Sequence, residues 1–226
     1  MEITITEKDL FPATLGNLLT ALSEAGFFEE GLLAGSWVFV LYGIIYNLEF
    51  PIRTLDVDFA VRSEPDLKGD TTDIENVITS LGYLAVTERS GWRKYTKEGL
   101  GVEFITNRKG SKDGVDLIKF FNITALRLPF LDLLFDSPID IVHEDFKLRI
   151  PGAESLFLHK LVTSHRRIEA SKEERDLEQC RYLVKIIDFS KVTKIMQDRR
   201  WSRESLKKIK AACRQIDLPI LKIGLG

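Results

Sequence analysis

The chain has 226 residues, of which 44% are hydrophobic and 29% are charged, a composition typical of an ordinary soluble globular protein. Its 32 basic and 34 acidic residues give a formal net charge of −2, which excludes a wholly basic nucleic-acid coat and an acidic tail protein. No apolar run reaches the roughly 18 residues of a membrane-spanning helix, and the first residues lack the basic start of a signal peptide. We therefore expect a cytoplasmic protein without membrane contact, whose cysteines, Cys180 and Cys213, are reduced thiols.

The balanced total charge hides an uneven distribution along the chain. Residues 159–214 contain 16 lysines and arginines but only 8 acidic residues, a net charge of +8 that leaves −10 for the rest of the chain. An acidic body joined to a basic segment indicates a polyanionic ligand held between the two parts.

The spacing of apolar residues and of turn residues predicts alternating helices and strands up to about residue 150. We expect helices over residues 13–25 and 37–47, followed by a strand over residues 54–61. Thr72 and Glu75 match a capping box, in which each side chain bonds the backbone at the other's position, and they predict a helix to about residue 81. Further strands are expected over residues 83–86, 92–96, 102–106, 139–143 and 146–150.

After Pro151 and Gly152 the strand signals end, and apolar residues recur at helical spacing. Helices are expected over residues 154–168, 173–187, 190–199 and 203–216. The sequence thus predicts an α/β (α+β) fold, with a mixed-sheet domain over residues 1–150 and a C-terminal helical domain over residues 151–226.

Two aspartates lie two residues apart in the strand expected over residues 54–61. Successive residues of a strand point to opposite faces, so Asp56 and Asp58 share one face, while alternate apolar residues from Leu55 to Val61 share the other. Neighbouring carboxylates repel, and a divalent cation such as Mg²⁺ removes the conflict because it prefers carboxylate oxygens. The alternative is a solvent-facing strand with two aspartates that have no function.

Upstream of the aspartates, an apolar run at residues 32–34 enters a turn at Gly35 and Ser36 that opens a helix. Backbone N–H groups at the start of a helix bind anions, and a glycine lets a phosphate approach closely. The pair therefore predicts a phosphate-binding turn. The simpler alternative is that Ser36 only caps the helix.

Downstream of the aspartates, Glu103 is the one acid among the apolar residues of the strand expected over residues 102–106. If this strand lies beside the strand that carries the aspartates, Glu103 supplies a third carboxylate on the same face. The alternative is that Glu103 is an exposed edge residue opposite Lys94 or Lys97.

In their order and spacing, these three stretches resemble the nucleotidyltransferase superfamily of polymerase-β type. The stretches are Gly35-Ser36, Thr54-Leu55-Asp56-Val57-Asp58 and Val102-Glu103-Phe104-Ile105-Thr106. Further stretches are similar to bacterial minimal nucleotidyltransferase-like proteins related to toxin–antitoxin systems, namely those around residues 126–132, 150–154, 158–161 and 172–179. The resemblance implies a mixed-sheet nucleotidyltransferase core with helices, in which a Gly-Ser turn holds a triphosphate and three acids bind two Mg²⁺ ions, or Mn²⁺.

The resemblance also assigns roles to individual residues. Catalysis and metal binding fall to Asp56, Asp58 and Glu103, and nucleotide binding falls to Gly35-Ser36. The third acid of the superfamily is frequently Asp where this chain has Glu, so Asp116 competes with Glu103 for that place.

Two basic residues, Lys160 and Arg167, are further candidates for nucleotide binding, because they lie seven residues apart and project from one face of a helix. The alternative for each is a solvated helix face. The activity that the resemblance implies is transfer of NMP from an NTP to a hydroxyl group of a tRNA, a protein or a small molecule, with an antitoxin as a partner. The alternative from another class is a non-catalytic module of the same fold, which binds NTP or serves as a toxin–antitoxin partner.

Overall fold

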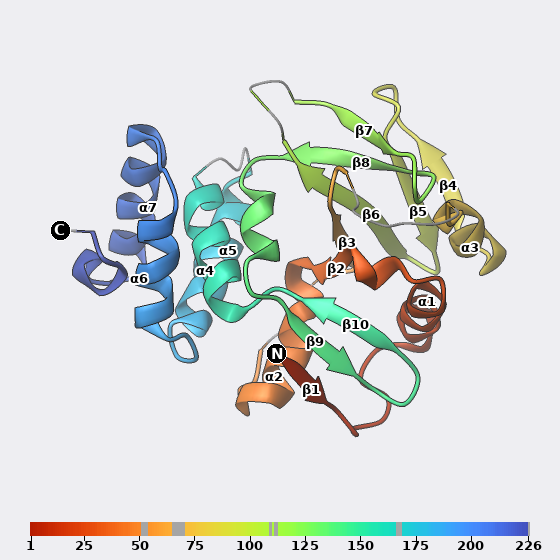
Figure 1. Cartoon of the computed structure of the whole chain (residues 1–226), viewed down its shortest axis with the longest axis horizontal. Coiled ribbons are helices and arrows are strands. Elements are labelled where there is room, and N and C mark those ends of the chain that lie inside the picture. Colours follow the sequence, from red (N-terminus) through yellow and green to blue (C-terminus); the bar gives the residue numbers. More distant parts are fainter. Residues whose placement is uncertain (51–53, 65–70, 109, 111–112, 166–168, 226) are drawn as a thin grey trace. The chain divides into compact units, whose positions relative to one another are not determined.

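The computed structural model describes residues 1–50, 54–64, 71–108, 110, 113–165 and 169–225. Contacts divide the chain into two compact units (Figure 1). The α/β unit comprises Met1–Asp132 and Pro138–Pro151, and the helical unit comprises Leu133–Ser137 and Gly152–Gly226. The mixed sheets of the first unit and the helices of the second confirm the predicted fold class.

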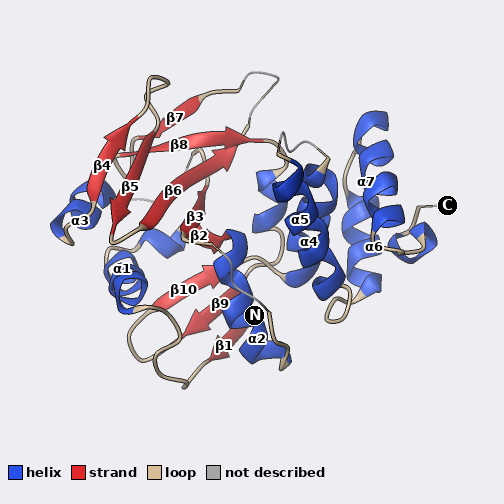
Figure 2. Ribbon diagram, turned by 180° about the vertical axis from the view of Figure 1, so that it is seen from behind, coloured by secondary structure: helices blue, strands red, loops and turns tan. Residues whose placement is uncertain are grey.

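A mixed sheet forms the centre of the α/β unit (Figure 2). Its strands are β2 (Gly31–Ala34), β3 (Asp56–Val61), β4 (Leu84–Thr87), β5 (Arg93–Lys97), β6 (Leu100–Asn107), β7 (Val115–Ile118) and β8 (Ile123–Leu128). They follow in the order β2-β3-β6-β5-β4, and β8 pairs with the last residues of β6 and with β7. β3 and β6 are parallel, whereas β2 and β5 run antiparallel to their neighbours. Strand β6 therefore has partners on both sides.

A smaller sheet of the same unit consists of β1 (Glu2–Thr4), β9 (Ile139–Val142) and β10 (Lys147–Ile150), in the order β1-β9-β10. β9 and β10 form the predicted hairpin, and β1 pairs with β9 in parallel. Strands β1, β7 and β8 were outside the predicted elements, because short strands without regular alternation are recognised only from the partners they pair with.

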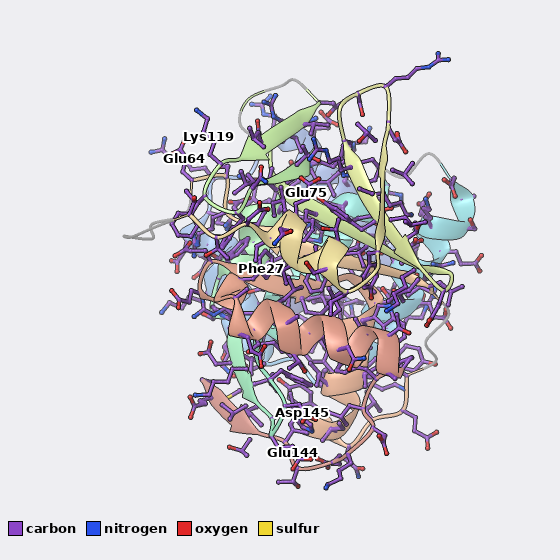
Figure 3. The ribbon with its side chains drawn as sticks, turned by 90° about the vertical axis from the view of Figure 1, so that its right-hand side faces the viewer. Phe27, Glu64, Glu75, Lys119, Glu144 and Asp145 are labelled. Atoms are coloured by element: carbon purple, nitrogen blue, oxygen red, sulfur yellow. The ribbon has the colours of Figure 1, made fainter. Side chains whose placement is uncertain are left out.

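One face of the main sheet is covered by aromatic rings. Phe59 of β3 and Phe104 of β6 lie with ring centroids 5.7 Å apart. Phe27, which is labelled in Figure 3, packs edge-on against both rings. Phe27 belongs to η1 (Phe27–Glu29), which follows the predicted helix α1 (Ala13–Glu24). Burial of these rings, together with the leucines of α1, supplies the core that supports β3 and β6.

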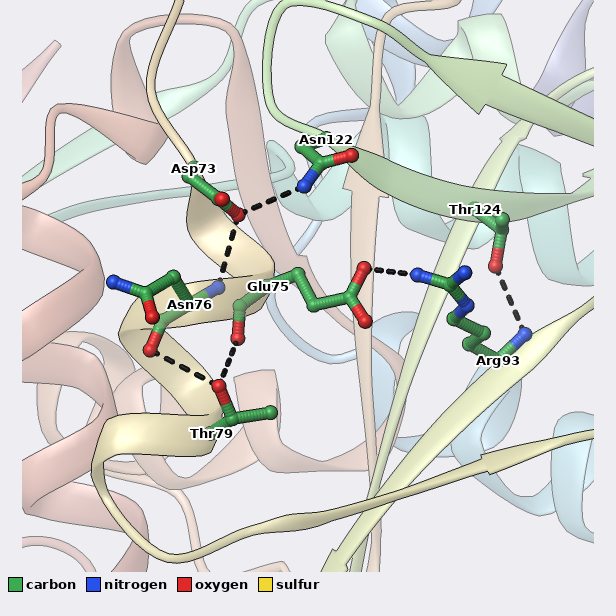
Figure 4. A network of polar contacts seen from close by, with 7 residues as sticks. All are labelled: Asp73, Glu75, Asn76, Thr79, Arg93, Asn122 and Thr124. Atoms are coloured by element: carbon green, nitrogen blue, oxygen red, sulfur yellow. Dashed lines mark hydrogen bonds and ion pairs between the residues drawn. The ribbon is translucent and has the colours of Figure 1, made fainter.

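Helix α3 (Ile74–Ser80) begins with a capping residue that differs from the prediction. Asp73 is the N-cap, since its Oδ1 accepts hydrogen bonds from the backbone N–H of Asn76 and from Asn122 Nδ2, each at 3.0 Å (Figure 4). Both hydrogen bonds lower the pKa of Asp73, and the bond from Asn76 has the larger effect. The capping box predicted at Thr72 is therefore wrong by one residue, because the Asp73 side chain takes the capping position.

The same polar network orients strand β5. Glu75 of α3 accepts a hydrogen bond from the guanidinium of Arg93, and the backbone N–H of Arg93 donates to Thr124 Oγ1 at 2.8 Å (Figure 4). The side chain of Arg93 is thereby held toward α3. Since side chains alternate along a strand, the next residue, Lys94, points to the opposite face of the sheet.

Two further details of the α/β unit bear on the predictions. The helix expected over residues 37–47 is present as α2 (Val38–Tyr46). Leu55, which the alternation placed on the buried face, is 66% exposed. That prediction is wrong because β3 begins only at Asp56, so Leu55 precedes the regular strand.

The helical unit contains the four predicted helices, with ends that differ by up to four residues in the described part of the chain. They are α4 (Ala153–Ser164), α5 (Ala170–Leu183), α6 (Phe189–Asp198) and α7 (Arg203–Gln215), followed by η4 (Ile220–Ile223). Helix α4 is the central helix and packs against the other three (Figure 2). Residues 166–168 of the predicted first helix lie outside the described residues.

The short segment Leu133–Ser137 belongs to the helical unit although it precedes β9 in the chain. It overlaps η3 (Leu131–Phe135), and two contacts at Asp136 hold it there. The carbonyl oxygen of Asp136 accepts from Ser155 Oγ at 2.6 Å, and its carboxylate pairs with Arg199 at 3.0 Å. No helix in the described ranges is long and apolar enough to cross a membrane.

Candidate active site

The pairing of β3 with β6 brings the three predicted acids to one face of the main sheet. In this parallel ladder Asp58 stands opposite Glu103, and Asp56 stands opposite Gly101. Residues that face each other across a ladder point to the same side, so Glu103 lies on the side of both aspartates. The opposite side of the same strands is apolar and fully buried, as at Val57. The strand sequences thus separate a packed face from a carboxylate face.

The predicted Gly-Ser turn lies directly beside this carboxylate face. Strand β2 ends at Ala34, which pairs with Asp58 of β3. Gly35 follows with φ +68°, and a Cβ atom at this position would overlap the Oδ2 atom of Asp58. Both the backbone conformation and the space therefore require glycine. The turn continues through η2 (Gly35–Trp37) into α2, and neither helix start has a side-chain capping bond, so the alternative of Ser36 as a simple N-cap is not what the structure shows.

A lysine that the motif did not include completes the cluster. Lys94 of β5 stands opposite Glu103 on the other side of β6. Its Nζ lies 2.6 Å from Glu103 Oε1 and 2.9 Å from Asp56 Oδ1. Burial lowers the pKa of Lys94, but the hydrogen bonds and charges of Glu103 and Asp56 outweigh it and raise the pKa above its ordinary value. Lys94 is therefore an ammonium ion at neutral pH.

The contact between Glu103 and Lys94 matches part of the alternative drawn from the sequence. Glu103 does stand opposite Lys94, but it is not an edge residue, because β6 has β3 on one side and β5 on the other. The side chain of Glu103 is 18% exposed, against 58% for Asp56. The cluster is thus half-buried at Glu103 and open at Asp56.

Gly101 provides the room that Lys94 needs to reach Asp56. The lysine stem runs from β5 across β6, and Gly101 is the β6 residue between Thr96 and Asp56. A Cβ atom at Gly101 would lie 2.7 Å from both Lys94 Cε and Asp56 Oδ1. A side chain here would displace one of the two groups. Neither Lys94 nor Gly101 could be assigned from the motif alone, since their places depend on the register of the hairpin that joins β5 to β6.

The acids have the chemistry of a magnesium site, since hard carboxylate oxygens are the ligands that Mg²⁺ prefers. Within the described residues, however, no group of three or more His, Cys, Asp or Glu side chains is arranged to hold a metal ion. The ammonium of Lys94 contacts one oxygen of Asp56 and one oxygen of Glu103. The oxygens fit Mg²⁺ in kind, and the Mg²⁺ or Mn²⁺ site remains a prediction.

The competing third acid, Asp116, is not brought to this cluster. It lies on β7, which is separated from β3 by β8 and β6. Its carboxylate is bound by Arg127 of β8, and this contact raises the pKa of the arginine. The structure thus places Glu103, and not Asp116, beside the aspartates.

The two basic candidates lie in the helical unit. Lys160 of α4 is buried, and its Nζ lies 2.8 Å from Oδ1 of Asp176 on α5. Its side chain is 7% exposed, so little of it is open to a ligand. Arg167 lies outside the described residues. A contact of either residue with a nucleotide remains a prediction.

The comparison with protein-family models agrees with the resemblance that the motifs carry. A family model described as nucleotidyltransferase matches residues 13–203. One solved structure of similar shape is an antigenic nucleotidyltransferase-like protein from Paracoccidioides brasiliensis, with 15% sequence identity, a TM-score of 0.49, and coverage of 89% of this chain and 88% of that chain. The comparison with curated proteins found no match to this chain.

Proposed function

The chain belongs to the nucleotidyltransferase family whose model matches residues 13–203, and on this premise we propose that it transfers NMP from an NTP to a hydroxyl group with the help of Mg²⁺. In this reaction the hydroxyl oxygen bonds to the α-phosphorus, the bond from the α-phosphorus to the oxygen that bridges to the β-phosphate breaks, and pyrophosphate leaves. The hydroxyl proton passes to solvent.

One observation carries the proposal: the parallel register sets Asp58 beside Glu103, with Asp56 on the same face and the Gly35 turn against Asp58. Three carboxylates at one place repel one another, and Lys94 pairs with two of them, Asp56 and Glu103. A site of this kind favours the approach of further cations. The closeness of a glycine turn adds backbone N–H groups that suit phosphate.

In the proposed reaction, Asp56, Asp58 and Glu103 hold Mg²⁺, or Mn²⁺, and Gly35 and Ser36 bind the triphosphate. When bound, the two ions that the resemblance implies would lower the pKa of the attacking hydroxyl and neutralise charge on the leaving pyrophosphate. The contribution of the chain is to hold these groups in place: strand backbone fixes the acids, and the turn orients the α-phosphate toward the acceptor.

For the acceptor, we propose the terminal hydroxyl of an RNA such as tRNA. On α7, residues Arg203, Lys207, Lys210 and Arg214 recur at spacings of four, three and four, which places them on one face of the helix. The buried residues of α7, among them Ile209, form the other face. A basic stripe of this length suits a phosphate backbone. Protein and small-molecule acceptors, and an antitoxin partner, remain the competing outcomes.

The test is label transfer from nucleotides in the presence of Mg²⁺. The chain is incubated with RNA and with each NTP labelled at the α-phosphate and, in parallel, at the γ-phosphate. We expect RNA to acquire the α-label only, because NMP transfer releases the γ-phosphate within pyrophosphate. Asp58→Asn and Glu103→Gln should each reduce transfer by at least about 100-fold, since each removes a carboxylate that would hold the ions which stabilise the charge on the reacting phosphate. Two acids outside the cluster serve as controls: Asp116→Asn, and Glu144→Gln in the β9–β10 turn (Figure 3), should retain transfer.

The alternative is a module of the same fold that binds NTP without catalysis. Calorimetry separates the two functions. A catalytic site requires Mg²⁺ for tight NTP binding and loses affinity in Asp58→Asn. NTP binding that is indifferent to Mg²⁺ and to Asp58→Asn, together with no labelled acceptor in cell extract, would establish the non-catalytic module instead.

A further inference from the structure

We propose that Leu84 and Val86 of β4 form a platform for the terminal nucleobase of the RNA acceptor, on the same face of the main sheet as the three acids. This inference rests on the proposed function, because it names the part of the acceptor that lies beside the reacting phosphate. It adds two binding residues that none of the sequence motifs contains.

Two rows of ladder partners cross the carboxylate face and end at the platform. The first row has one residue from each strand of the path β2-β3-β6-β5-β4, namely Ala34, Asp58, Glu103, Lys94 and Val86. The second row runs beside it from β3 to β4, through Asp56, Gly101, Thr96 and Leu84. Ladder partners point to the same side of a sheet, so the platform and the acids share one face.

Both platform residues are exposed although both are apolar. The exposed fraction is 72% for Leu84 and 52% for Val86. On β5, Tyr95 lies between the ladder partners of these two residues, and its side chain is fully buried on the opposite, packed side of the sheet. Strand β4 therefore turns apolar side chains away from the core, which reverses the usual alternation of a half-buried strand. Two such side chains next to each other form a patch of the kind that marks a contact surface.

The direction of the proposed reaction assigns this end of the face to the acceptor. In an in-line displacement at the α-phosphorus, the attacking and the leaving oxygen lie on opposite sides. The turn at Gly35, which we propose to hold the triphosphate, lies at the β2 end of the first row and beside Asp58. Pyrophosphate leaves on that side, so the attacking hydroxyl comes from the side of β5 and β4.

The spacing between the acids and the platform suits one nucleoside. Adjacent strands lie about 4.8 Å apart, so Val86 is about 10 Å from Glu103, across β5. This distance is comparable with the length of a nucleoside. A terminal hydroxyl placed at the acids would therefore bring its own base over Leu84 and Val86. A nucleobase has a flat face that packs on apolar side chains.

The charge of the β4–β5 hairpin favours a polyanionic acceptor. Residues outside 159–214 carry a net charge of −10, but the hairpin departs from this excess of acids. Residues 84–97 contain four basic residues and one acidic residue, which are Arg89, Arg93, Lys94, Lys97 and Glu88. Arg89 is exposed in the turn between the two strands. Basic residues next to an apolar patch suit the phosphates and the base of an RNA end.

The test compares RNA binding with nucleotide binding. The double variant Leu84→Thr, Val86→Thr replaces the platform by polar side chains that still favour a strand. We expect it to bind a short single-stranded RNA at least about tenfold more weakly than the wild type, measured by fluorescence anisotropy, because the base loses its apolar contact. Its KM for RNA should rise by the same factor, while its affinity for NTP stays unchanged. Val86→Ile keeps the patch apolar and should bind RNA like the wild type.

Ala85 provides the matched control on the same strand. It is exposed, and it stands opposite Tyr95, so it points to the other side of the sheet. Ala85→Thr therefore adds the same side chain to β4 without touching the carboxylate face, and its RNA binding should equal that of the wild type. Circular dichroism and the melting temperature show whether each variant is folded.

A measurement on the wild type complements the variants. In the methyl NMR spectrum of the full chain, the signals of Leu84 and Val86 should shift when the RNA is added and should stay in place when NTP is added alone. The result does not depend on how well a variant folds.

The outcomes separate this inference from the proposed function. Equal RNA affinity of the wild type and the double variant, or RNA that shifts neither methyl signal, would overturn the platform and leave nucleotidyl transfer intact. Methyl shifts with NTP alone, together with weaker NTP binding by the double variant, would overturn the assignment to the acceptor. RNA contact at both residues in a chain that transfers no α-label would overturn the proposed function and confirm that the platform binds RNA.

Discussion

Gly35 is the residue at which the site tolerates a side chain least. Its φ of +68° is costly for any other residue by about 1–2 kcal/mol, and a Cβ atom would overlap the Asp58 carboxylate. Gly35→Ala should therefore reduce kcat/KM for nucleotidyl transfer at least about tenfold, by moving Asp58 and the turn. Gly16, where a Cβ atom meets nothing within 4 Å, is the control, and Gly16→Ala in α1 should keep full activity and gain slight stability. Equal activity of both variants would contradict the role given to the turn.

Individual residues of the site show which features the sequence could predict and which it could not. The alternation of β3 was enough to predict that Asp56 and Asp58 share a face, because period two is a local property. The sequence could place Glu103 on the same face only if its strand lies beside the strand of the aspartates. The pairing of β3 with β6 shows that it does. Lys94 of β5 contacts Asp56 of β3 across the intervening strand β6, so no local sequence pattern could have predicted this contact.

Among the secondary-structure elements, α4 and α5 are joined by a buried ion pair. Lys160 and Asp176 are each 7% exposed and lie 2.8 Å apart. Asp176→Asn leaves the lysine charge buried without its counter-charge and should lower the free energy of unfolding by about 3–5 kcal/mol, measured by urea denaturation. The double variant Lys160→Met, Asp176→Leu should recover most of that loss. If the double variant is no more stable than Asp176→Asn, the pair is not an isolated electrostatic unit.

The double variant also tests the predicted nucleotide contact of Lys160. If Lys160 binds the triphosphate, its replacement removes that contact even when the protein is stable. The double variant would then bind NTP more weakly than the wild type. Unchanged NTP affinity would assign Lys160 to the packing of α4 against α5 alone.

Tyr83, which follows α3, links it to α1 and makes stability depend on pH. Its hydroxyl donates to the carbonyl oxygen of Thr14 at 3.0 Å, and burial, followed by the charge of Glu98, raises its pKa to about 12. Because the folded state holds this proton more tightly than the unfolded state, the contribution is complete below the unfolded pKa of about 10. It is then lost as the pH rises through about 12. Urea denaturation at several pH values should show a steeper loss of stability above pH 10 for the wild type than for Tyr83→Phe, and equal slopes would contradict the shift.

The elements themselves were largely predictable. Helices with clear apolar periodicity, such as α1 and α7, lie within one residue of their expected ends. Strands β7 and β8 were not expected, because β8 owes its conformation to pairing with β6 and β7 and not to an alternating sequence. The start of α3 moved to Asp73 because capping is decided by side-chain contacts, here including Asn122 from the β7–β8 turn.

At the scale of the whole molecule, the uneven charge predicts how the RNA acceptor that we propose would bind. Lys207 and Arg214 lie on the exposed face of α7, and their reversal to Glu should weaken tRNA binding at least about tenfold at moderate salt. It should also lower the slope of log K against log salt concentration by about 0.7 for each phosphate that the variant no longer neutralises. Lys119→Glu, a reversal in the α/β unit (Figure 3), is the control and should leave tRNA binding unchanged. Loss of NTP affinity in the α7 variant, with tRNA binding intact, would contradict the assignment.

The hydrogen bonds of β6 to strands on both sides determine how readily its amides exchange with solvent. Its amides bond to β3 on one side and to β5 and β8 on the other, whereas β4 has β5 as its only partner within the described sheet. Deuterium from heavy water should therefore label β4 first and β6 last. Glu103 lies on β6, the strand expected to exchange last. Local opening of the sheet edge would therefore leave the distance between the Glu103 and Asp58 carboxylates unchanged.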